Sequence, residues 1–336
     1  MWPVLARLRA LALAPVVARA RLKVLALAPV VARVRLRALA LAPVVALALA
    51  LPLSGCGGIS SASTTGVSVV AAENFWGSIA KQIAGDKADV QSIITNPAQD
   101  PHSYEPTAND ARTMATSQLA IVNGIGYDPW APKLLNANPD GARIVLTVGS
   151  LFGLHDGDNP HRWYDPAEVE VVANTIAADL EKLEPSHAAY FEHQLNQFKT
   201  IGLARYHALI AQIKARYGGV PVGASESIFA LQAPALGLNL VTPYSFMKAV
   251  SEGTEVSAQD TITTQQQITR HQIKVWVYNS QNATPQIQQL NALARANHIP
   301  IATVTETLSP QNDTFERWQV AQLEGIERAL REATGR

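Results

Sequence analysis

The sequence predicts an α/β protein made of two lobes, each built on a parallel-type sheet, joined by one long helix. From residue 66 onward, short apolar stretches rich in Val, Ile and Ala alternate with longer segments whose apolar residues recur every three or four positions. This alternation indicates βαβ units. A long helical segment at 185–217 divides the strands into two groups, because Pro185 starts it and Gly218-Gly219 ends it. We therefore expect an N-terminal lobe at 66–184, a rigid linking helix at 185–217 and a C-terminal lobe at 218–336.

The elements of the first lobe follow one another closely. The pattern predicts strands at 66–72, 88–94, 119–122 and 144–148, and helices at 75–84 and 109–117. The run Asp165-Pro166-Ala167-Glu168 places an N-cap, an N1 proline and an acidic N3 residue in succession, so it predicts a helix that ends near residue 183.

The linking helix and the second lobe continue the pattern. Six apolar residues of the helix recur mostly at spacings of three and four: Phe191, Leu195, Phe198, Tyr206, Leu209 and Ile213. At 1.5 Å per residue the helix would be about 50 Å long. In the second lobe we expect strands at 220–224, 239–242, 274–278 and 299–304, helices at 227–236, 261–271 and 285–298, and a last helix capped from Asp313 that ends near 333.

Composition and charge exclude several classes of protein. The 336 residues carry 27 basic and 27 acidic side chains, but the first 56 hold eight basic and no acidic ones. The remainder has a net charge of −8, which argues against nucleic-acid binding. With 48% apolar residues the chain is neither disordered nor a coiled coil. The single cysteine, Cys56, excludes an intrachain disulfide and any multi-cysteine metal site.

The first 55 residues read as a targeting signal. The unit LALAPVVARARLKV at 11–24 recurs with small changes at 25–38 and begins again at 39–46, and the period is too short for a solenoid. The uncharged run at 38–53 is shorter than the roughly 20 residues that span a bilayer, although an N-terminal membrane helix is an alternative. Leu53-Ser54-Gly55-Cys56 resembles a bacterial lipobox. The resemblance implies cleavage before Cys56, lipidation of its thiol, a flexible tether at 56–65, and an exported protein anchored to the outer face of the cell membrane.

Four residues with metal-ligand side chains each follow a predicted strand. They are His102, His161, Glu226 and Glu306. Ligands of open α/β sheets bind beyond the carboxyl ends of the strands. Two imidazoles and two carboxylates suit a divalent transition metal, and the carboxylates would neutralise its charge. Since these side chains bind metal only when deprotonated, affinity should fall in acid.

The body of the chain, about residues 66–334, resembles the metal-binding solute-binding proteins of ABC importers, the family of ZnuA, TroA and PsaA. The resemblance rests on DPHSYEPT at 100–107, LAIVNG at 119–124 with Trp130 soon after, NPHRW at 159–163, the 185–217 helix, and Phe229 three residues after Glu226. It implies two lobes bridged by a rigid helix, with a metal cleft between the lobes. The cleft would hold one Mn²⁺ or Zn²⁺ ion, delivered to an ABC permease and its ATPase. A monomer that is not an enzyme is expected.

The same resemblance implies the ligand set. His102 and His161 fall on the family's first two ligand positions, and Glu226 falls on the third. Glu306 stands where the family usually has Asp, so Asp313 or a water is an alternative fourth ligand. A zinc-dependent hydrolase, which keeps an open coordination position for water, and an adhesin of the same fold are the rival functions. The run Gly223-Ala224-Ser225-Glu226-Ser227 lacks the final glycine of a nucleophile elbow, and no Walker motif is present.

Overall fold

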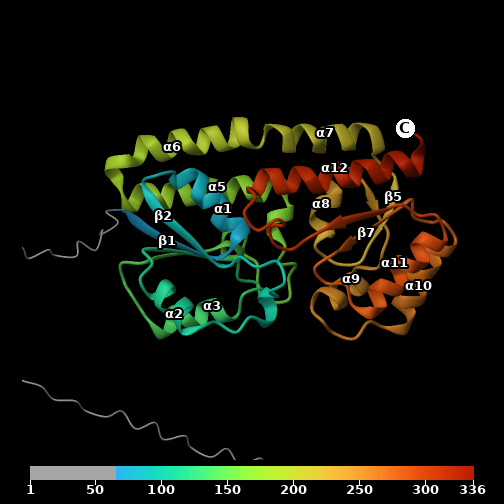
Figure 1. Cartoon of the computed structure of the whole chain (residues 1–336), viewed down its shortest axis with the longest axis horizontal. Coiled ribbons are helices and arrows are strands. Elements are labelled where there is room, and N and C mark those ends of the chain that lie inside the picture. Colours follow the sequence, from blue (N-terminus) through green and yellow to red (C-terminus); the bar gives the residue numbers. More distant parts are fainter. Residues whose placement is uncertain (1–65) are drawn as a thin grey trace, which may run out of the picture. The chain divides into compact units, whose positions relative to one another are not determined.

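Two four-stranded parallel sheets organise residues 66–336, the part of the chain that this computed structural model describes (Figure 1). The predicted α/β class with two parallel-sheet lobes is confirmed. The expected signal, its repeats, the tether and Cys56 lie outside the described residues. Among the helices of residues 66–336, none has the length and apolar character needed to cross a membrane.

The first sheet has the strand order β2-β1-β3-β4, all parallel. Alternate residues of β1 face opposite sides: Val69 and Ala71 pack with α1 and α5, whereas Val70 and Ala72 pack with α2 and α3. Helices on both faces explain why β1 is almost entirely apolar. The elements of this lobe are β1 Val67–Glu73, α1 Asn74–Ala84, β2 Ala88–Ile94, η1 Pro101–Ser103, α2 Ala108–Ala115, β3 Leu119–Val122, α3 Trp130–Ala137, β4 Ile144–Thr147, α4 Val148–Leu151, η2 Arg162–Tyr164 and α5 Pro166–Leu183.

The second sheet repeats this plan with the order β6-β5-β7-β8. Its elements are β5 Pro221–Ala224, α8 Phe229–Ala235, β6 Asn239–Leu240, α9 Tyr244–Ser251, α10 Ala258–Thr269, β7 Val275–Asn279, α11 Pro285–Ala296, β8 Ile301–Val304 and α12 Phe315–Thr334. The strand expected at 239–242 is only two residues long. The last helix has Thr314 as its N-cap instead of Asp313, because Thr314 is the residue that takes the extended backbone before the first turn.

The segment between the lobes is helical but not one regular α-helix. It consists of η3 Pro185–His187, α6 Ala188–Gln197, the π-helical turn η4 Phe198–Gly202 and α7 Ala204–Tyr217. Helix α6 packs on α1 and α5 of the first lobe, and α7 packs on α12 (Figure 1). The π turn therefore lies where the segment changes partner.

The two lobes share a continuous apolar core that extends from β1 to α12. Hydrogen bonds join them as well. Leu308 donates its backbone N–H to Asn74 Oδ1 at 3.2 Å, and Phe315 donates to Ser78 Oγ at 2.9 Å. The Tyr164 hydroxyl lies 2.8 Å from the carbonyl oxygen of Thr305. The 305–315 segment of the second lobe is thus held by the first, close to Glu306.

Candidate metal centre

The candidate ligands follow the carboxyl ends of strands in both sheets. His102 comes after β2, His161 after β4, Glu226 after β5 and Glu306 after β8. In each sheet the strand order reverses in the middle, between β1 and β3 and between β5 and β7. Crevices at such reversal points are where open α/β sheets bind ligands. Both sheets thus present their ligand-binding edges to a common cleft.

His102 is held by the short η1 turn that its motif forms. The Asp100 side chain caps this turn, accepting the His102 backbone N–H at 2.9 Å and the Ser103 hydroxyl at 2.9 Å. The imidazole packs edge-on against the ring of Tyr127, with 4.7 Å between centroids. His102 is half-buried, which makes it the most accessible of the four candidate residues.

His161 is fully buried, and the pKa of its imidazole is lowered because burial disfavours the charged form. Its Nδ1 lies 2.8 Å from Asn159 Oδ1. Since that oxygen only accepts hydrogen bonds, the proton belongs on Nδ1 and the lone pair on Nε2. A neutral imidazole held in this tautomer is the form that binds metal.

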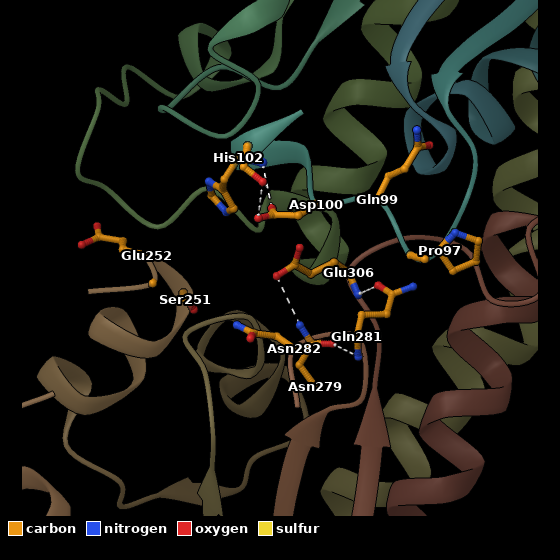
Figure 2. Close-up of a pocket in the computed structure, with 13 residues that line it drawn as sticks. Pro97, Gln99, Asp100, His102, Ser251, Glu252, Asn279, Gln281, Asn282 and Glu306 are labelled. Atoms are coloured by element: carbon orange, nitrogen blue, oxygen red, sulfur yellow. Dashed lines mark hydrogen bonds between the residues drawn. The ribbon is translucent and has the colours of Figure 1, made fainter. Parts of the chain in front are cut away.

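Glu306 meets the two histidines from the second lobe. Ligand atoms of His102, His161 and Glu306 all lie within 4.8 Å of one another, and Glu306 Oε1 is 3.8 Å from His161 Nε2. The Gln281 side chain fixes the Glu306 backbone by accepting its N–H at 2.7 Å. Figure 2 shows His102 and Glu306 facing each other across the cleft.

Glu226 lies outside this group of three, but Asn279 connects it to the group. The Asn279 amide donates to Glu226 Oε2 at 3.1 Å and to Glu306 Oε1 at 3.2 Å. Asn279 is itself fully buried and ends β7. Its Oδ1 accepts the backbone N–H of Gln281 at 2.9 Å, so the amide is locked in the orientation that points Nδ2 at both carboxylates.

The two carboxyl groups differ in their affinity for protons. Burial raises the pKa of Glu226 well above its usual value, and the negative charge of Glu306 raises it further. Burial acts on Glu306 too, but the imidazoles of His161 and His102 outweigh it and lower the pKa of that carboxyl. The pKa of Glu226 is thus shifted upward and that of Glu306 downward, so Glu306 is the more acidic of the two.

Among the four candidate ligands, three buried side-chain atoms have no hydrogen-bond partner within the described residues: Nε2 of His102, Nε2 of His161 and Oε1 of Glu226. Leaving such atoms unsatisfied in a protein interior is costly. A cavity of about 390 Å³ reaches this place past His102, Asp100, Glu252 and Glu306 (Figure 2). The donor set and the unsatisfied atoms together fit a divalent transition-metal ion.

The alternative fourth ligand, Asp313, lies away from this cluster and pairs with Arg317 at 3.1 Å, and it lines a different cavity. Two residues near the ligands had no role in the sequence analysis. Tyr127 places its hydroxyl 3.4 Å from Glu306 Oε2, and Asn279 connects the carboxylates. Both stand at or just after the carboxyl end of a strand, β3 and β7, so the same positional rule would have found them.

Comparison with known proteins gives the family. A family model described as the zinc-uptake complex component A, periplasmic (ZnuA), matches residues 69–329. The chain belongs to the ZnuA family.

Individual relatives match the chain at low identity and over only part of its length. The chain is 27% identical over 151 residues to the manganese-binding lipoprotein MntA of Halalkalibacterium halodurans, which covers 43% of this chain and 50% of MntA. It is 30% identical over 178 residues to the metal ABC transporter substrate-binding lipoprotein SsaB of Streptococcus sanguinis, with 48% and 55% covered. The chain spans about half the length of the curated relatives it matches.

The fold also matches solved structures. A Mn-bound mutant of a periplasmic metal binding protein from Candidatus Liberibacter asiaticus superimposes with a TM-score of 0.66 at 20% identity. The match covers 78% of this chain and 98% of that one. At this identity the likeness concerns the fold alone.

A second pair of carboxyl groups, Glu73 and Asp128, is buried in the first lobe of this ZnuA-family chain. Glu73, at the end of β1, is fully buried, and neither of its carboxyl oxygens has a hydrogen-bond partner among residues 66–336. Burial and the neighbouring Asp128 raise the pKa of Glu73 well above its usual value. Burial also raises the pKa of Asp128 to about 6, although the backbone N–H groups of Gly124 and Asn123 oppose the shift.

We expect Glu73→Gln to stabilise the metal-free protein, and more so at pH 8 than at pH 5. A carboxyl whose pKa is raised on folding binds more protons in the folded state, so its contribution to stability falls as pH rises above the unfolded value near 4.5. Glutamine removes that penalty and adds donors that face Asp128. Thermal unfolding should show a gain of a few degrees at pH 8. Glu192→Gln, on the exposed side of α6, is the control, and an equal gain for Glu73→Gln at both pH values would contradict the assignment.

Proposed function

We propose that the protein captures one divalent transition-metal ion between its lobes and delivers it to an ABC-type permease driven by its ATPase. His102, His161, Glu226 and Glu306 are the proposed ligands. The observation that carries the proposal is the meeting of two imidazoles and a carboxylate within 4.8 Å, with both Nε2 atoms buried and left without partners in residues 66–336. Membership of the ZnuA family and relatives named as metal-binding lipoproteins support the delivery step.

Capture by ligands from both lobes suits a carrier. Imidazoles of the first lobe would bind the ion first, and the carboxylates of the second would complete the shell, so the ion favours the closed cleft. Metal binding requires the carboxylate form of Glu226, and because the pKa of that carboxyl is raised, protons would compete with the metal there. A zinc-dependent hydrolase instead requires an open position for water beside a general base. The interior placement of the candidate ligands favours the carrier.

Manganese is the proposed physiological cargo, with zinc as a strong competitor. Two carboxylates make a harder donor set than three imidazoles, and each carboxylate can bind through both oxygens. The higher coordination number that results suits Mn²⁺. Raw affinity should still follow the general order, with Zn²⁺ above Mn²⁺.

The first expectation is that Mn²⁺ or Zn²⁺ raises the melting temperature of the purified, chelator-treated protein. Metal at about a hundredfold excess over Kd adds about 2.7 kcal/mol to the stability of the folded state, or several degrees for a chain of this size. Because protons compete for the ligands, the rise should be larger at pH 7.5 than at pH 5.5. His161→Ala should abolish it, whereas His193→Ala on the exposed side of α6 should not. No rise in demonstrably metal-free wild type would refute metal capture.

The second expectation concerns selectivity. Glu226→His should raise affinity for Zn²⁺ relative to Mn²⁺ by roughly tenfold, because an imidazole softens the donor set and removes a negative charge. Competition titrations with a fluorescent chelator measure the ratio directly. Glu332→His, at the exposed end of α12, makes the same chemical change away from the cleft. If the two variants give the same ratio as wild type, Glu226 is not a ligand.

The third expectation concerns the anchor, which falls outside the described residues. Cys56→Ala should move the protein from the membrane fraction to the soluble fraction of a bacterial host that processes lipoproteins, because the lipid-bearing thiol is lost. Immunoblots of fractionated cells test this. A variant that stays with the membrane would favour the uncleaved N-terminal helix.

A further inference from the structure

Asn159 contacts a candidate ligand of one lobe and the backbone of the other lobe at the same time. Its Oδ1 accepts the His161 backbone N–H at 3.1 Å and lies 2.8 Å from His161 Nδ1. Its Nδ2 donates to the carbonyl oxygen of Ser227 at 2.7 Å. Ser227 belongs to the second lobe and directly follows Glu226. One amide therefore joins the lobes at the candidate metal centre.

The second-lobe end of this contact is firmly held. Ser227 is buried, its backbone N–H donates to Ser251 Oγ at 3.1 Å, and the two hydroxyl oxygens lie 2.9 Å apart. A second hydrogen bond joins the same loop to the second lobe: Lys248 Nζ donates to the carbonyl oxygen of Gly157 at 2.7 Å. The loop that carries Asn159 is thus held by two hydrogen bonds to the second lobe, one at Ser227 and one at Lys248.

We propose that Asn159 is a positioning residue that couples the His161 imidazole to closure of the second lobe over the metal. The proposal rests on the proposed metal site. When the lobes are closed, Ser227 fixes the amide and the amide fixes the tautomer and direction of the imidazole. When the second lobe withdraws, the amide loses its acceptor and is free to rotate, so the imidazole loses its orientation. Opening would then weaken metal binding on the first lobe as well as on the second, which favours release.

An aspartate at position 159 distinguishes the contact with His161 from the contact with Ser227, because it keeps the first and loses the second. Asn159→Asp keeps an oxygen for His161 Nδ1–H but sets a carboxylate oxygen against the Ser227 carbonyl, where nothing donates. Asn159→Leu removes both halves. Asn138→Asp adds the same charge at the exposed end of α3 and is the matched control.

The test measures Mn²⁺ affinity and hydrogen–deuterium exchange on the full chain purified in detergent, with and without Mn²⁺. In Asn159→Asp we expect affinity within about threefold of wild type, with amides at 225–229 exchanging roughly five to ten times faster in the Mn²⁺ form, as expected when one interlobe hydrogen bond is lost. Asn159→Leu should lose affinity by roughly 10–100-fold. Lys248→Met, which leaves His161 untouched, should also speed exchange at 225–229.

The results distinguish failure of the proposed coupling from failure of the proposed metal site. Wild-type protection at 225–229 in Mn²⁺-bound Asn159→Asp would overturn the coupling, and so would equal losses of affinity in the Asp and Leu variants. Failure of wild type to bind Mn²⁺ or Zn²⁺ would instead remove the proposed function itself. Exchange of the metal-free variants, compared with that of metal-free wild type, reports whether they fold.

Discussion

The contact between Glu306 Oε1 and His161 Nε2, 3.8 Å apart across the lobes, is the interaction on which the rest of the site depends. Buried carboxylates are costly unless they are paired and hydrogen-bonded. Asn279 and Tyr127 supply hydrogen bonds to Glu306, but no cationic side chain approaches it among the described residues. The arrangement leaves a negatively charged site beside neutral imidazoles, and a cation is the partner that would complete it.

The fold holds this site in place because the two lobes share one apolar core and are joined by hydrogen bonds. Their apolar core is continuous, and Asn74, Ser78 and Tyr164 of the first lobe hold the segment around Glu306. Large rotations of one lobe against the other would expose this core. Closure and opening should therefore be small movements of the second lobe and its loops, and a displacement of about 1 Å is enough to break a hydrogen bond.

The sequence predicted the fold class and the strands well because those features are local: apolar runs, caps and glycine stops are visible in the chain. His102 and His161 were found through motifs with distinctive neighbours. Asn279 was missed because the rule on carboxyl ends of strands was applied only to residues with metal-ligand side chains, and its link to Glu226 and Glu306 forms only in the tertiary structure. The π turn was missed for a different reason: the sequence pattern passed from Phe198 directly to Tyr206, a spacing of eight that a regular helix also allows, and it did not include the buried Leu203.

That irregular turn fixes the permitted length of the linking segment. Buried residues occur at Phe191 and Phe198, then at Leu203 and Tyr206, so the apolar stripe slips by one residue between 198 and 203. Each residue of an α-helix turns the chain by about 100°. The surplus residue rotates α7 so that its stripe faces α12, and it leaves Ile201 at 65% exposure. Removing one residue here would restore a regular helix but would rotate the apolar face of α7 by about 100° away from α12. Substitutions at 199–202 are therefore far more tolerable than a change in their number.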